Sequence, residues 1–70
     1  MPRQLSLEER LGNIIREHRE SLGLSQEAFA EKCDLHRTYI SQLERGLKSP
    51  TVRTLALIAD KLKLTPDELL

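Results

Sequence analysis

The apolar residues of this chain recur at three- and four-residue steps, the spacing that places side chains on one face of an α-helix. The first run, which includes one histidine, consists of Leu7, Leu11, Ile14, Ile15, His18 and Leu22. Ser6 and Glu9 form a capping box at its start, and Gly23 supplies a left-handed stop at its end. No segment keeps the two-residue alternation of a half-buried strand. The pattern therefore predicts an all-α fold.

Two short helices are predicted next, in the middle of the chain. Ser25 is an N-cap for a helix that ends at Asp34, a residue type that tolerates the left-handed conformation. A third helix follows almost at once, starting at residue 36 or 37 and ending at Gly46. The segment that joins these two helices is therefore only a tight turn.

Two further helix starts lie in the C-terminal third. Ser49 followed by Pro50 is an N-cap with proline at the first helical position, which opens a fourth helix that runs to about residue 63. Thr65 and Glu68 form another capping box, so a fifth helix begins there. Because no linker or repeat interrupts the chain, we expect residues 1–70 to form one domain, a compact five-helix bundle with residues 1–5 as a flexible tail.

The charges are balanced overall but separated along the chain. Eleven Lys and Arg residues face eleven Asp and Glu residues, a formal net charge of zero. Residues 1–35 carry five basic and seven acidic side chains, whereas residues 36–53 carry four basic side chains and one acidic one. No apolar run approaches the roughly 18 residues of a membrane span, and the start of the chain lacks the apolar core of a signal peptide. We therefore expect a cytoplasmic protein with no membrane partner.

The residues that carry most enzyme chemistry are nearly absent. One cysteine and two histidines offer no internal disulfide and no metal-ligand spacing, so Cys33 reads as a small buried apolar residue. His18 lies on the apolar stripe of the first helix and reads as a packed histidine. No Gly-rich loop and no grouping of nucleophile, base and oxyanion donors is present. We therefore expect a protein that is not an enzyme, with no cofactor, no metal and no small-molecule ligand.

Residues 26–45 have the spacing of two short helices that cross at a steep angle across a tight turn. Such a crossing needs a small residue where the helices meet, and Ala30 occupies that position. The apolar residues that would form the inner face are Phe29, Cys33, Leu35, Ile40 and Leu43. The spacing predicts a helix-turn-helix unit.

The second helix of this unit has a polar outer face. With Ile40 and Leu43 in the core, the rotation of 100° per residue turns a polar set outward. The set is Thr38, Gln42 and Arg45, flanked by Arg37 and Ser41. Arg can bond guanine, Gln can bond adenine, and the Thr methyl can contact a thymine methyl. A merely solvated face is the alternative, but such a face usually mixes Glu with Lys, and this one has no carboxylate. The pattern favours a reader of DNA bases.

The chain resembles the phage-repressor-like, or xenobiotic-response-element (XRE) type, helix-turn-helix regulators over about residues 8–70. The resemblance lies in IREHRESLGLSQEAFAEK, HRTYISQLERG and KSPTVRTLALIADKLKLTPDELL. Within that family, LHRTYISQLERG looks most like the controller proteins of restriction–modification systems, which are small stand-alone dimers. The resemblance implies a lambda-repressor-like fold and a sequence-specific regulator of transcription that binds double-stranded DNA. It also implies a homodimer on a (pseudo)palindromic operator, with half-sites about 34 Å or a multiple of that apart.

The resemblance further implies roles for individual residues. Base contacts fall to Arg37, Thr38, Ser41 and Gln42, and phosphate contacts to Ser25, Gln26, His36, Tyr39, Arg45, Lys48 and Ser49. Tyr39 could instead pack against the domain, and His36 could be a structural N-cap. Asp34 stands where the family commonly has Gly, and it adds a negative charge to a turn that would face phosphates.

Two structural contacts are also expected. The resemblance implies a partly buried salt bridge between Arg19 and Glu44, which would fix the first helix against the third. An apolar patch near the C-terminus is predicted to be the two-fold interface of the dimer; it consists of Leu57, Leu64, Leu69 and Leu70. The alternative is that Leu64 and Leu69 close the small core.

A protein-binding module with the same fold, such as an antitoxin or anti-repressor, is the alternative function. The zero net charge favours it, because nonspecific affinity for DNA comes chiefly from neutralised phosphates.

Overall fold

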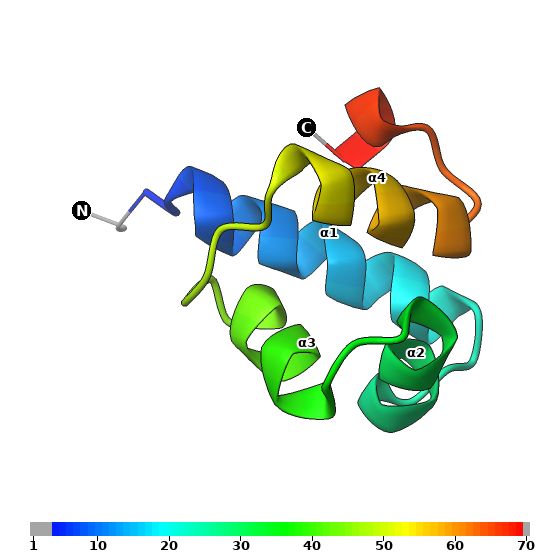
Figure 1. The fold of residues 1–70 in the computed structure, drawn as a ribbon. Helices are drawn as coiled ribbons and strands as arrows, with labels where there is room; N and C mark the ends of the chain where they lie inside the picture. The colour runs from blue at the N-terminus through cyan, green and yellow to red at the C-terminus, as the bar shows by residue number, and fades with distance from the viewer. Residues whose placement is uncertain (1–3, 70) are drawn as a thin grey trace.

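The computed structural model describes residues 4–69, apart from the side chain of Pro66, and in this part of the chain it contains four α-helices and one turn of 3₁₀-helix (Figure 1). The elements are α1 (Leu7–Ser21), α2 (Gln26–Cys33), α3 (Arg37–Glu44), α4 (Val52–Lys61) and the 3₁₀ turn η1 (Pro66–Leu69). No strand occurs among the described residues, so the all-α prediction is confirmed.

The predicted start of α4 is wrong by two residues. Thr51, not Ser49, is the N-cap, and its Oγ1 accepts a hydrogen bond from the N–H of Thr54 at 3.1 Å. Ser49 and Pro50 lie in the irregular segment before it. Both Ser49 and Thr51 can cap a helix, but the residue three positions after Thr51 is Thr54, whose hydroxyl accepts a second bond from Thr51 Oγ1 at 3.0 Å, whereas Val52, three positions after Ser49, has no hydroxyl.

The predicted fifth helix is a single 3₁₀ turn. The capping signal itself is present, since the Glu68 carboxylate accepts hydrogen bonds from the N–H and the hydroxyl of Thr65 at 3.2 and 2.9 Å. Only four residues follow the cap within η1, too few to repeat the bonding of an α-helix. The described fold is therefore a four-helix unit closed by a short turn.

Helix α1 crosses the middle of the molecule, with α4 and η1 above it and α2 and α3 below it in Figure 1. Every element contributes to the core, whose largest fully buried side chains are Phe29, Ile15, Ile40, Leu43, Ile58 and Leu69. Leu69 is 1% exposed, so the prediction that it lies on an open interface patch is wrong. The apolar side chain after the last cap folds inward and closes the core, as the alternative reading had it.

Gly12 lets α1 and α3 approach each other closely. A Cβ atom at Gly12 would lie 2.4 Å from the carbonyl oxygen of Leu43 and 2.6 Å from that of Glu44. A side chain at this position would therefore collide with backbone, which cannot turn aside as a flexible side chain can. The C-terminal end of α3 rests directly on the backbone of α1, and this contact fixes how the outer face of α3 is presented.

Gly46 ends α3 with a positive φ of 74°, followed by the loop to α4. Its N–H donates to the carbonyl of Leu43, and the N–H of Leu47 donates to that of Gln42, the pair of bonds that closes many helix ends. A Cβ at Gly46 would lie within 2.9 Å of Glu9 in α1. The backbone at Gly46 is therefore held by hydrogen bonds to α3 and by close packing against α1.

No helix among residues 4–69 is long and apolar enough to cross a membrane.

Candidate nucleic-acid interface

Helices α2 and α3 are joined by a turn of three residues. Asp34 ends α2 in the left-handed conformation, at φ 55° and ψ 43°. Its N–H donates to the carbonyl of Glu31, and the N–H of Leu35 donates to that of Ala30 at 2.9 Å. Ala30 is 2% exposed and occupies the interior position predicted for it. The short turn between α2 and α3 is therefore built with Asp in a left-handed conformation that glycine adopts more easily.

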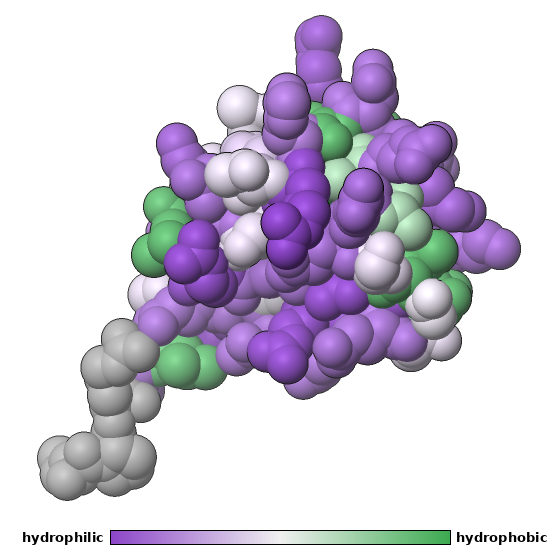
Figure 2. Space-filling view, turned by 90° about the horizontal axis from the view of Figure 1, so that it is seen from below, coloured by the Kyte–Doolittle hydropathy of each residue, from purple (hydrophilic) through white to green (hydrophobic). Residues whose placement is uncertain are grey.

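The inner face of α3 holds Ile40, Leu43 and Glu44, which are all buried. The outer face carries Arg37, Thr38 and Arg45, which are exposed, and Ser41 and Gln42, which are half-buried. Because Glu44 turns inward, this outer face contains no carboxylate. Figure 2 views the molecule from the side of α2 and α3, and that surface is largely hydrophilic, with apolar patches towards its edges.

For His36 and Tyr39 the sequence allows either a structural role or a phosphate contact, and the two residues differ in which structural contacts they make. His36 occupies the N-cap position of α3, but its side chain makes no capping hydrogen bond and is exposed. The structural role considered for its imidazole is therefore absent. Tyr39 is half-buried and packs against the hydrophobic core. Its ring takes the packing role, which leaves only the hydroxyl for a contact outside the domain.

The remaining predicted phosphate contacts lie at the start of α2 and after α3. Ser25 is the N-cap of α2, and its Oγ accepts the N–H of Ala28 at 3.0 Å. Arg45 is exposed, with Nε 3.4 Å from the carbonyl oxygen of Ser41. Lys48 and Ser49 are exposed in the loop before α4. These polar groups lie on the chain segments that border the outer face of α3.

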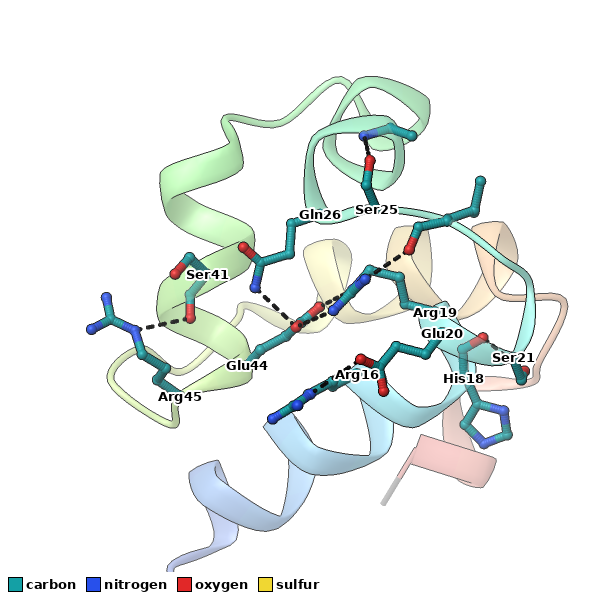
Figure 3. A network of polar contacts seen from close by, with 12 residues as sticks. Arg16, His18, Arg19, Glu20, Ser21, Ser25, Gln26, Ser41, Glu44 and Arg45 are labelled. Atoms are coloured by element: carbon teal, nitrogen blue, oxygen red, sulfur yellow. Dashed lines mark hydrogen bonds and ion pairs between the residues drawn. The ribbon is translucent and has the colours of Figure 1, made fainter.

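The structure brings Arg19 and Glu44 together in a buried pair (Figure 3). Arg19 Nε donates to Glu44 Oε2 at 2.7 Å, and Nη2 donates to Oε1 at 3.0 Å. The third nitrogen, Nη1, donates to the carbonyl of Leu24 at 2.7 Å. The hydrogen bond to Glu44 raises the pKa of the Arg19 guanidinium, although burial opposes this shift. The pair ties α1 to the last residue of α3 and to the turn before α2.

Gln26 joins the same pair, a contact that the sequence reasoning missed. Its Nε2 donates to Glu44 Oε1 at 3.1 Å (Figure 3). No sequence signal connects the two residues, since they lie 18 positions apart on different helices. Only the crossing of α2 over α3 brings the first residue of one helix to the last residue of the other.

The predicted dimer patch is smaller than expected. Leu57 and Leu64 are half-buried and pack against the core, Leu69 is buried, and Leu70 lies outside the described residues. The most exposed large apolar side chains lie elsewhere, and they are Leu5, Leu7, Leu22, Leu47 and Val52.

Within residues 4–69 no three His, Cys, Asp or Glu side chains gather as a metal site requires.

Comparison with known proteins adds three findings. A family model described as Helix-turn-helix matches residues 15–69. Control protein C.BamHI of Bacillus amyloliquefaciens is 45% identical over 47 residues, a match that spans 67% of this chain and 58% of that protein. The chain thus covers less than two thirds of that relative. The restriction-modification controller protein C.AhdI from Aeromonas hydrophila has a similar crystal structure, with a TM-score of 0.84 and 34% identity over 89% of this chain and 94% of that one.

A fourth comparison concerns a DNA complex. The biofilm master regulator SinR, solved in complex with DNA, superposes with a TM-score of 0.80 and 28% identity, covering 84% of this chain and 95% of that one.

Proposed function

The chain belongs to the helix-turn-helix family, and on that basis we propose that it is a sequence-specific DNA-binding regulator of transcription whose α3 enters the major groove. The observation that carries the proposal is the outer face of α3, which is polar and free of carboxylates because Glu44 is turned into the core. The solved SinR–DNA complex and the controller-protein relatives support it. We also propose that the protein is cytoplasmic, because a DNA-binding regulator needs access to the genome. We further propose that it is not an enzyme.

We assign base contacts to Arg37, Thr38, Ser41 and Gln42. The first two are exposed near the N-terminal end of α3, which is the end that helix-turn-helix proteins direct at base edges. Gln42 lies about one turn further along on the same face, where its amide can pair with adenine.

Phosphate contacts are assigned to two groups that flank this face. Ser25 and Gln26 lie at the start of α2, and the loop after α3 supplies Arg45, Lys48 and Ser49. The His36 imidazole and the Tyr39 hydroxyl complete the set: the imidazole is exposed and makes no capping hydrogen bond, and the Tyr39 ring packs against the core, which leaves its hydroxyl for such a contact. Such contacts fix the position of the protein on the duplex and carry no sequence information themselves.

We propose that the protein binds its operator as a homodimer. One α3 spans too few base pairs to select a site in a genome, and two related by a two-fold axis would read half-sites about 34 Å apart. Leu57 and Leu64, with Leu70, are the apolar residues that we assign to the interface. Sedimentation that shows a monomer at high micromolar concentration would contradict the dimer.

Selection of binding sites from a random duplex pool, in about 100 mM salt, tests the proposal. We expect an inverted repeat. Arg37→Ala and Gln42→Ala should each relax preference at one position and weaken binding by about 1–3 kcal/mol. Arg16→Ala is the matched control, because Arg16 is exposed on α1, pairs with Glu20 in the same helix at 3.5 Å and belongs to no proposed contact. Its affinity should match that of the unsubstituted protein.

Recovery of no motif, with no binding at that salt, would refute base reading. The protein-binding alternative, an antitoxin or anti-repressor module, would then lead.

A further inference from the structure

The Glu44 carboxylate accepts hydrogen bonds from residues on two other helices, α1 and α2. Its Oε1 atom accepts a hydrogen bond from Arg19 Nη2 at 3.0 Å and another from Gln26 Nε2 at 3.1 Å. The Glu44 side chain is 2% exposed, so it cannot itself reach a ligand. Gln26, in contrast, is half-buried at the first residue of α2 and borders the surface assigned to DNA. Gln26 is therefore the link between a buried ion pair and that surface.

The chemistry of this contact fixes the orientation of the Gln26 amide. An ionised carboxylate accepts hydrogen bonds and donates none, so the NH₂ end of the amide must face Glu44. Figure 3 shows the carbonyl oxygen of Gln26 on the side turned away from Glu44. One N–H of the Nε2 group is used by Glu44, and the second makes no hydrogen bond within the described part of the chain. Gln26 thus offers one N–H in a direction set by the buried pair.

We propose that Glu44 is a positioning residue for DNA binding, which holds the Gln26 amide so that its second N–H donates to a phosphate oxygen of the operator. The inference rests on the proposed function and deepens it, because it connects the Arg19–Glu44 pair to DNA affinity as well as to stability. A free glutamine on a surface would lose rotamer freedom when it binds. The bond to Glu44 removes that freedom when the protein folds, so the donor is already in place when DNA arrives.

The inference predicts energetic coupling between Gln26 and the buried pair, which a double-mutant cycle measures. Gln26→Met keeps the length of the side chain and removes the amide. Arg19→Met with Glu44→Met removes both charges together, because a buried pair replaced by apolar residues of similar volume is often tolerated whereas half a pair is not. Operator affinity is measured for each variant alone and for all three substitutions combined, well below the melting temperature of each protein.

We expect Gln26→Met to weaken operator binding by about tenfold per protomer, the effect of losing one hydrogen bond to a charged group. The paired Met substitutions should weaken it by a similar factor, and Gln26→Met should add nothing further in that background. Gln42→Met is the matched control: Gln42 is assigned to a base and does not contact Glu44, so its effect should be the same in both backgrounds.

A Gln26→Met effect that is equally large in both backgrounds would overturn the positioning role of Glu44, and no effect in the unsubstituted background would overturn the phosphate contact. If the paired variant does not fold, the two Nε2 proton resonances of Gln26, identified by their loss in Gln26→Met, decide the question. In the free protein they should be well separated, and operator DNA should shift one of them far more than the other. Equal shifts, or none, would overturn the proposal. Absence of any DNA binding by the unsubstituted protein would instead refute the proposed function. Operator binding that Gln42→Met weakens would show that the proposed function holds, whatever the effect of Gln26→Met.

Discussion

Replacing Gly12 by Ala tests whether the backbone of α1 lies in direct contact with the C-terminal end of α3. The added Cβ would lie 2.4, 2.6 and 2.8 Å from three backbone atoms of Leu43 and Glu44. Nonbonded carbon contacts need about 3.3–4 Å, so α1 and α3 would have to move apart by roughly 1 Å. Overpacking of this kind costs about 1–3 kcal/mol, and rigid backbone on one side favours the upper end of that range. The same movement would stretch the Arg19–Glu44 pair, which spans the same two helices.

Helix propensity alone would make the Gly12→Ala protein more stable, so a measured loss of stability has to come from the clash. Ala is favoured over Gly inside a helix by about 1 kcal/mol. We therefore expect a net loss of about 2 kcal/mol, allowing for strain in the pair, out of roughly 4–10 kcal/mol for a domain of this size. The melting temperature should fall by roughly 8–16 °C.

Urea unfolding followed by circular dichroism at 222 nm measures the loss. Gly23→Ala is the matched control, since Gly23 has a φ of 73° but no atom within 4 Å of the added Cβ. It should cost only the left-handed conformation, about 1–2 kcal/mol. A Gly12→Ala protein as stable as the unsubstituted one, or more stable, would refute the close approach of α1 and α3.

Four further predictions concern three residues, namely Asp34, Leu69 and Cys33. Asp34→Gly should raise stability in urea unfolding by about 0.5–1 kcal/mol, because it relieves the left-handed conformation. Asp34→Asn, which tolerates that conformation and removes the charge, should raise operator affinity in a DNA titration without the gain in stability. Leu69→Ala should destabilise the fold by about 2–5 kcal/mol, because Leu69 is 1% exposed, and a cost below 1 kcal/mol would contradict its place in the core. Burial raises the pKa of the Cys33 thiol in the folded protein, an effect that the nearby Lys61 partly offsets. The unfolded chain therefore loses this proton first, so stability should fall as pH rises above about 9, and Cys33→Ala should remove that part of the decline in urea unfolding at pH 7 and 10.

The helices that the sequence predicted best are those whose signals are local. The capping box of Ser6 and Glu9 is present, and each residue accepts the other's N–H, at 3.0 and 2.9 Å. The predicted start of α4 is wrong because Ser49 and Thr51 are both good caps, and the sequence pattern alone does not decide between them. The fold family itself, a helix-turn-helix regulator resembling controller proteins, is confirmed by the family match and by the relatives.

What sequence could not give depends on contacts between distant segments. The sequence pattern assigns no role to Gly12, and its role appears only once the end of α3 packs on it. The bond between Gln26 and Glu44 likewise depends on the crossing of two helices, which periodicity does not describe. Leu69 could equally face a partner or the core, because the apolar pattern is the same in both cases.

The residues of α3 that hold it in the fold and those that we propose to contact DNA lie on opposite faces, and this division bears on how such proteins diversify. Ile40, Leu43 and Glu44 hold the helix in the fold, whereas Arg37 and Thr38 are exposed. Substitutions at exposed positions usually change stability by no more than about 0.5 kcal/mol. If the outward residues read bases as proposed, new operator preferences can arise by exchange of those residues while the chain keeps its margin of stability. A duplicated copy of such a gene could move to a new binding site in single steps, each of which leaves a folded protein.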